Sequence, residues 1–116
     1  MKIVSELDTK KEILSTLKNY LTGFIPGVED IINLFRIGKE AEALSFMKDE
    51  IDGLQWIYDA VVLTQDIQVK KIEVSSIGPF FVEMVDALES MDYILLGDLL
   101  EYEIIPILKQ WQEELL

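Results

Sequence analysis

Apolar side chains recur along the first part of this chain at alternating steps of three and four residues. The positions that follow this rhythm are Leu14, Leu17, Leu21, Phe24, Val28, Ile31 and Phe35. Because an α-helix completes a turn every 3.6 residues, such a series lies along one side of a helix, whereas a half-buried strand needs strict alternation. The spacing therefore predicts an amphipathic helix that buries one face.

We expect this first helix to span residues 9–37. Thr9 and Glu12 have the spacing of a capping box, which favours a start there, and Gly38 suits the residue that ends a helix. The rhythm stays in phase through Pro26, which argues against two shorter helices. A proline inside a helix removes one backbone hydrogen bond and clashes one turn back, so a kink is predicted near Pro26.

A second helix is predicted from about Lys39 to Thr64. Its apolar positions are Leu44, Met47, Ile51, Leu54, Tyr58 and Val61. Further apolar residues beside this stripe make the apolar face broad enough to contact two other helices. Residues 65–74 alternate polar and apolar side chains, but a single strand has no partner to pair with. We interpret them as an extended connection whose apolar members lie along the bundle.

Two further helices are predicted in the remainder of the chain. The third begins near Ser75 or Ser76, which are good capping residues, carries Pro79 in its first turn and ends near residue 90. The fourth follows the N-cap Asp92 and should bend at Pro106. Since 116 residues can bury one core, we expect a single domain over residues 1–116. The predicted fold is all-α, an antiparallel four-helix bundle.

The charge balance restricts the partners. The chain carries 22 acidic and 10 basic residues, a formal net charge of −12. Such a surface repels the phosphates of nucleic acids and anionic lipid headgroups, so we expect neither nucleic acid nor a membrane as partner. Acidic residues begin at Glu6, and no apolar run approaches the roughly 20 residues of a membrane span. We therefore expect a cytoplasmic protein.

The residue types available for catalysis are few. Histidine and cysteine are absent, which removes the usual triads, zinc sites and thiol nucleophiles, and we expect no enzyme activity and no cofactor. The densest acidic group, Asp98, Glu101 and Glu103, is interpreted as a solvated surface. A site for magnesium or calcium built from these carboxylates, serving a metal-dependent enzyme, is the alternative.

The fourth helix carries more apolar surface than one packing stripe needs. Its main arc is Leu96, Leu100, Ile104, Ile107 and Trp111; a second arc is Leu95, Leu99, Tyr102 and Ile105. The second arc requires a cover. Neighbouring helices could bury it, or the N-terminal Ile3, Val4 and Leu7 could lie across it, or it could form a groove for an amphipathic helix of another chain.

The groove alternative leads to a function, a non-enzymatic module that binds another protein. Aromatic residues are frequent anchors in such interfaces, and the candidate partner-binding set combines them with the second arc. It consists of Leu95, Leu99, Tyr102, Ile105, Trp56 and Trp111. A homodimer closed by the second arc is the structural alternative.

The C-terminal part of the chain distantly resembles the bacterial flagellin export chaperones. The resemblance is carried by the stretch Phe80–Leu88, by Asp92, by Leu95–Glu101 and by Trp111. It implies a small cytoplasmic helical bundle that holds the C-terminal segment of unassembled flagellin. The sequence departs from that family before Asp8, where a tyrosine-bearing segment is missing, and at Pro26 and Pro106.

Overall fold

A computed structural model describes the backbone of residues 2–115 and the side chains of residues 5–115, and in this part of the chain it is all-helical, without a strand. The elements in chain order are α1 (Lys2–Arg36), α2 (Glu40–Leu63), the 3-10 turn η1 (Gln65–Ile67), α3 (Gly78–Glu89), α4 (Tyr93–Leu99), the π-helical turn η2 (Leu100–Ile104) and α5 (Ile105–Glu114). The all-α prediction is confirmed. The antiparallel bundle remains a prediction.

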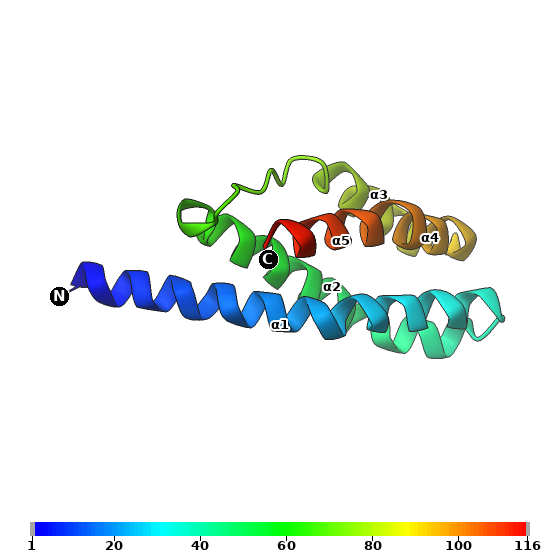
Figure 1. Cartoon of the computed structure of the whole chain (residues 1–116). Helices are drawn as coiled ribbons and strands as arrows, with labels where there is room; N and C mark the ends of the chain where they lie inside the picture. The colour runs from blue at the N-terminus through cyan, green and yellow to red at the C-terminus, as the bar shows by residue number, and fades with distance from the viewer. Residues whose placement is uncertain (1, 116) are drawn as a thin grey trace.

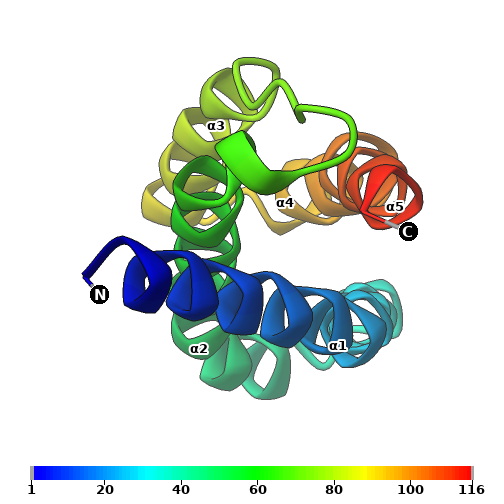
Figure 2. The same ribbon diagram turned by 60° about the vertical axis from the view of Figure 1, so that its left-hand side comes forward.

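The helices lie in two layers. α2 turns back along α1 to form one layer, and in the other α3 packs against α4, from which η2 and α5 continue (Figures 1 and 2). Residues 64–77 connect the layers along one side. The α1–α2 turn and the α3–α4 turn lie at the same end of the molecule, where the rings of Phe35 and Tyr93 stack with their centroids 5.7 Å apart.

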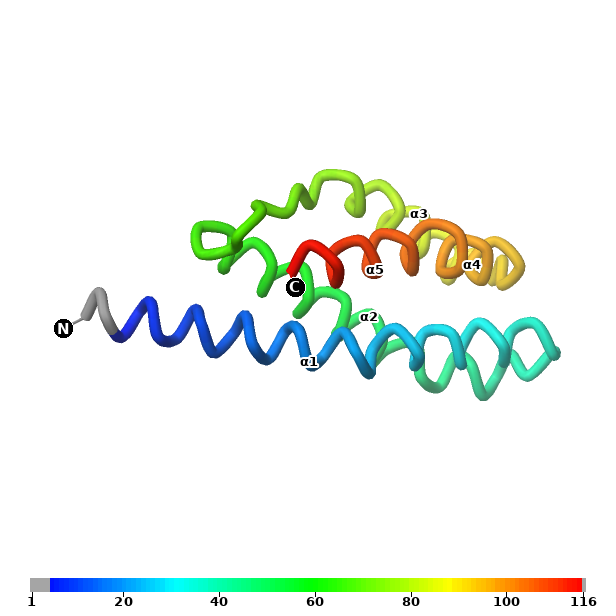
Figure 3. Tube along the Cα trace, in the orientation of Figure 1, coloured from blue at the N-terminus to red at the C-terminus, as the bar shows by residue number. Residues whose placement is uncertain are grey.

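α1 is longer than predicted. It begins at Lys2, and the Thr9 hydroxyl donates a hydrogen bond of 2.9 Å to the carbonyl of Ser5, one turn back. Thr9 therefore sits inside the helix, and the capping-box interpretation of Thr9 and Glu12 is wrong. α1 continues through Pro26 as one helix, as predicted (Figure 3). The kink near Pro26 stays a prediction.

Two helix ends follow their sequence signals. Gly38 has a φ of 80°, and the next amide, of Lys39, donates to the carbonyl of Leu34 at 2.8 Å, which closes α1 as predicted. The Asp92 side chain accepts a hydrogen bond of 3.1 Å from the amide of Leu95, which confirms it as the N-cap of α4.

α3 starts later than the predicted serine caps. Its first residue is Gly78, and its capping position is taken by Ile77, which makes no side-chain capping bond. Residues 75–77 form a turn instead, because Ile77 is buried in the core and its amide donates to the carbonyl of Val74 at 3.3 Å. Pro79 does lie in the first turn, as predicted.

The last predicted helix is interrupted by one wider turn. In η2 the amide of Ile105 donates to the carbonyl of Leu100, five residues back. Pro106 follows directly, and a proline has no amide hydrogen and presses on the carbonyl four residues before it. A π turn is a known way to accommodate such a disturbance within a helix. The bend at Pro106 stays a prediction.

The core lies between the two layers and contains most of the predicted apolar stripes. Side chains that are fully buried come from every helix and from the connection: Leu17, Leu21, Ile57, Ile72, Ile77, Met84, Leu96, Ile104 and Leu108. Ile72 confirms that the connection contributes to the bundle, while Val69 of the same segment is fully exposed. Tyr58, predicted on the apolar face of the second helix, is only partly buried, as is Phe81 of α3.

Candidate functional site

The predicted partner-binding residues do not form one surface. Leu99, Ile105 and Trp111 are 5%, 6% and 3% exposed and belong to the core. Their interpretation as partner-binding residues is wrong, because a buried side chain already packs against its own protein. α4 packs on both α1 and α3, so neighbours cover part of the second arc.

Leu95, Tyr102 and Trp56 do reach solvent. Leu95 is 42% exposed and Tyr102 is 65% exposed, on α4 and η2. Trp56 is on α2, where its ring packs edge-on against Tyr20 of α1 with centroids 5.2 Å apart, so it belongs to the α1–α2 contact instead. The three exposed residues therefore lie on two separate surfaces, one on α4 and η2 and one at the α1–α2 contact.

The start of α1 does not cover the second arc. Leu7 is 40% exposed, and the beginning of α1 lies at the far end of the molecule from α4 (Figure 1). The side chains of Ile3 and Val4, the other proposed covers, lie outside the described residues. Leu95 and Tyr102 remain open to solvent.

The acidic group near η2 holds a cation of the protein itself. Arg36, at the end of α1, places Nη2 2.8 Å from Oδ1 of Asp98 and 3.0 Å from Oε2 of Glu101. These hydrogen bonds, the one to Asp98 foremost, raise the pKa of Arg36. A β-carbon on Gly97 would lie 3.4 Å from the guanidinium, so Arg36 passes close to the backbone of α4. Among the described residues no group of three or more acidic side chains is arranged to hold a metal ion.

A hollow of about 270 Å³ lies between α2 and the start of α3. One wall is the middle of α2, where Leu54, Gln55 and Tyr58 follow each other at helical spacing. Leu54 is buried and forms the inner part, whereas Gln55 is exposed. We call this hollow the α2–α3 groove.

The other wall of the α2–α3 groove comes from the end of the connection and the first turn of α3. It consists of Val74, Ser75, Ile77, Gly78 and Phe81. Ile77 is anchored in the core, and Phe81 lies half-buried above it. A β-carbon added to Gly78 would meet no atom within 4 Å, which shows how little fills this side of the groove.

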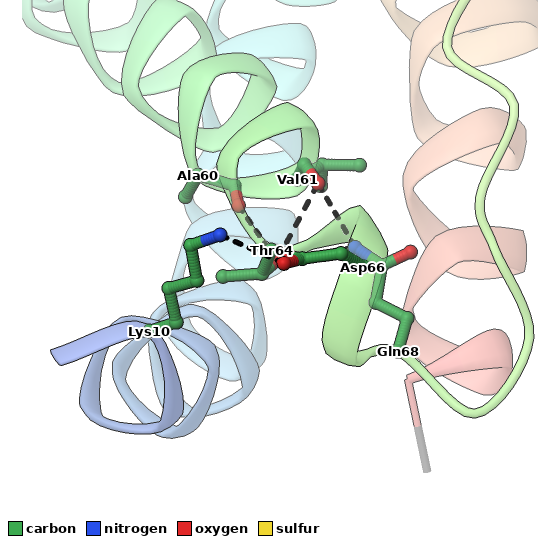
Figure 4. A network of polar contacts seen from close by, with 6 residues as sticks. All are labelled: Lys10, Ala60, Val61, Thr64, Asp66 and Gln68. Carbon is green, nitrogen blue, oxygen red and sulfur yellow. Dashed lines mark hydrogen bonds and ion pairs between the residues drawn. The ribbon is translucent and has the colours of Figure 1, made fainter. Parts of the chain in front are cut away.

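Hydrogen bonds of the Thr64 and Gln68 side chains anchor the start of the connection to the end of α2 (Figure 4). The buried Thr64 hydroxyl donates to the carbonyl of Ala60 at 2.7 Å. The amide group of Gln68 donates to the carbonyl of Val61 at 2.9 Å and to the Thr64 hydroxyl at 3.1 Å. Its oxygen accepts the backbone amide of Ile72 at 2.9 Å.

Two further contacts tie the same segment to the bundle. Gln65 donates from Nε2 to the carbonyl of Ile72 at 2.8 Å. Lys10 of α1 contacts Asp66 at 2.8 Å, also drawn in Figure 4, and this hydrogen bond lowers the pKa of Asp66. Because the buried Ile72 and these bonds hold the connection in place, the α2–α3 groove is bounded by an ordered wall.

The chemistry of the α2–α3 groove suits binding. Its lining is mostly aliphatic and aromatic, with the Gln55 amide, the Ser75 hydroxyl and the Tyr58 phenol as its polar side-chain groups. Such a surface gains by removing apolar area from water. None of the helices in residues 2–115 combines the length and apolarity that crossing a membrane requires.

The sequence pattern placed Leu54 and Tyr58 on the apolar face of the second helix and did not predict that they border a groove with Ile77 and Phe81. The missed wall has a signal of its own, since Ser75, Ser76 and Gly78 put small side chains where a helix begins. Small residues there leave space unfilled beside the larger Tyr58 and Phe81.

Comparison with known proteins identifies the family. The family model described as "Domain of unknown function (DUF8042)" matches residues 12–114, and the chain belongs to this family. Searches of curated proteins and of solved structures each return no match. The match begins within α1 and extends to the end of α5, so it includes both walls of the α2–α3 groove.

Proposed function

We propose that this protein is a non-enzymatic module that binds an amphipathic helix of another protein in the α2–α3 groove. The observation that carries the proposal is the groove itself, an apolar hollow of about 270 Å³ with an anchored wall on the side of the connection. In this proposal the protein acts in the cytoplasm as a chaperone or adaptor.

A helix is the occupant that matches the walls. Tyr58 on α2 and Phe81 on α3 are both half-buried and stand on opposite sides of the hollow. An amphipathic helix presents apolar side chains at steps of three and four residues, and one or two of them would fill a hollow of this size between the two rings. The partner helix would lie in the hollow between α2 and the start of α3.

The architecture assumed in this proposal is an antiparallel bundle, with α1 kinked near Pro26 and the last helix bent near Pro106. The resemblance of Phe80–Leu88 and Leu95–Glu101 to flagellin export chaperones supports the chaperone form of the proposal, since those proteins hold a segment of another chain. Fold resemblance alone does not establish function, so the test addresses the groove directly.

The proposal is tested with a yeast-displayed library of short helical peptides. Apolar residues are fixed at helical spacing on one side of each peptide, and all other positions are randomised. The library is sorted on the purified, fluorescently labelled protein. We expect clones that bind the protein, and each clone is then tested against three variants.

Phe81→Asp places a charge in the groove, and Ser75→Trp fills the groove from an exposed position without removing a core side chain. Both should abolish binding of the selected clones. Val82→Asp is the matched control, because Val82 is the next residue of α3, is 61% exposed and is not part of the lining. Circular dichroism verifies that each variant is folded. Clones that bind the folded Ser75→Trp variant as well as the original protein would contradict the proposal.

A homodimer through α4 is the second candidate function. Ile94, Leu95 and Tyr102 are 76%, 42% and 65% exposed, which leaves an apolar side of α4 and η2 uncovered. Under this candidate, light scattering gives twice the monomer mass, and Leu95→Asp with Tyr102→Asp halves it. A monomer mass for the original protein would exclude this candidate and leave the groove proposal intact.

A further inference from the structure

Both walls of the α2–α3 groove come from parts of the chain that contain no positive charge. The first wall, residues 54–58, lies within Asp49–Val69, and the second, residues 74–81, lies within Ile72–Leu108. Neither stretch contains a lysine or an arginine. The charged side chains next to the lining residues in sequence are therefore all acidic.

Two of these acidic residues adjoin the lining. Asp59 accepts a hydrogen bond of 3.0 Å from Nε2 of the lining residue Gln55, which places a carboxylate at the edge of the groove. On the other wall, the exposed Glu73 directly precedes Val74. We call Asp59 and Glu73 the acidic rim.

The basic residues of the connection, Lys70 and Lys71, are turned toward other features. Lys70 places Nζ 3.7 Å from Glu114, at the end of α5. Lys71 borders a different hollow, together with Lys10 and Val62. The acidic rim therefore acts without a compensating cation from the adjoining connection, in a molecule of net charge −12.

We infer that the occupant of the α2–α3 groove is a cationic helix, with lysine or arginine residues flanking the apolar side chains that enter the groove. This inference rests on the proposed function and adds the charge of the partner. An acidic or uncharged helix would fill the same apolar hollow, but only a basic one gains attraction from the rim. Opposite fields raise the association rate and select among partners of similar shape.

The sorted library supplies the first test, because its flanking positions are random. We expect the groove-dependent clones, those lost in Ser75→Trp, to be enriched in lysine and arginine and depleted in aspartate and glutamate at those positions. Their affinity should fall as salt rises from about 50 to about 500 mM, since added ions screen exposed charges.

Rim variants supply the second test. The double change Asp59→Asn and Glu73→Gln should weaken a basic clone several-fold, at a few-fold for each exposed pair. The matched control is Asp30→Asn and Glu42→Gln, which removes the same charge from exposed positions outside the groove. The control should change affinity much less, because its positions are far from the peptide.

Different results would overturn groove binding and the cationic character of the partner. Groove-dependent clones without a basic preference, or with equal affinity for the rim and control variants, would overturn the cationic partner and leave groove binding standing. Absence of any groove-dependent clone would overturn the proposed function itself.

Discussion

The two sides of α2 are packed very differently. Against α1, the helix is closed: Ile57 is fully buried, and a β-carbon on Gly53 would lie 2.5 Å from the Tyr20 hydroxyl and 2.7 Å from the ring of Phe24. Against α3, it is open: Tyr58 is half-buried, and the α2–α3 groove remains unfilled. One helix thus has a closed contact and an open contact.

The difference comes from what lies opposite each side. On the closed side a glycine lets a tyrosine and a phenylalanine lie directly on the backbone of α2, which removes empty space. On the open side the facing wall is a turn with small side chains. Burial of Ile77 and the hydrogen bonds of the Gln68 side-chain amide hold this turn in place. Stability should reside mainly in the closed contact, and binding in the open one.

The largest predicted effect contrasts Ile57 with Phe81. Ile57→Ala removes fully buried atoms from the closed contact and should lower the free energy of unfolding by about 2–5 kcal/mol. Phe81→Ala removes a larger side chain, but one already partly in water, and should cost less than Ile57→Ala. Urea unfolding followed by circular dichroism measures both. A larger loss for Phe81→Ala would mean that the α2–α3 contact is the closed one.

A smaller effect is expected from the same change at two glycines. Gly53→Ala adds a methyl group where Tyr20 and the buried Phe24 leave no room, and should cost about 1–3 kcal/mol. Gly78→Ala adds it where no atom lies within 4 Å, and should leave stability unchanged within about 0.5 kcal/mol. Thermal unfolding of the two variants is the measurement. Equal losses would show that the groove side is as tightly filled as the α1 side.

The smallest predicted effect concerns Glu50 of α2, near the closed contact. Its Oε2 is buried and accepts no hydrogen bond from the described residues, and burial, with a smaller contribution from Asp49, raises its pKa above the ordinary 4.5. Glu50→Gln removes this charge. Because water reaches much of the side chain and screens the charge, the gain in stability at neutral pH should be about 1 kcal/mol or less.

The pH dependence of that gain has a definite sign. A carboxyl group whose pKa is raised by folding favours the folded state while it is protonated, and this contribution is lost as the pH rises through the folded-state pKa. The original protein and Glu50→Gln should therefore be similarly stable below pH 4.5 and diverge above it, with the variant the more stable. Urea midpoints at several pH values test this. A variant that is less stable at neutral pH would indicate that Glu50 has a partner that it stabilises.

Features set by neighbouring residues could be predicted from the sequence. The helical stripe from Leu17 to Phe35, the end of α1 at Gly38 and the cap at Asp92 depend on the spacing and chemistry of residues close in the chain, and the structure contains all of them. Local signals failed where tertiary contacts outweighed them. Burial of Ile77, for example, sets the turn before α3, so neither Ser75 nor Ser76 caps the helix.

The candidate site was less predictable for two physical reasons. Placing the fourth helix at a constant 100° per residue ignored the wider turn of η2, which rotates Ile105 away from Leu95 and Tyr102 and into the core. The α2–α3 groove depends on the path of residues 68–77, which the contacts of Gln68 and Ile72 determine. These contacts join residues through tertiary structure, and the sequence pattern does not predict them. The pattern predicted apolar residues on the second helix, but it did not predict that they face the turn before α3 across a groove.

Nuclear magnetic resonance mapping tests the groove most directly. A basic helical peptide selected from the library is titrated into the isotope-labelled protein, and the backbone amide signals are followed residue by residue. The account predicts that the largest shifts fall on residues 54–58 and 74–81, the two walls of the groove. Shifts centred on Leu95 and Tyr102, with the groove walls unchanged, would contradict it.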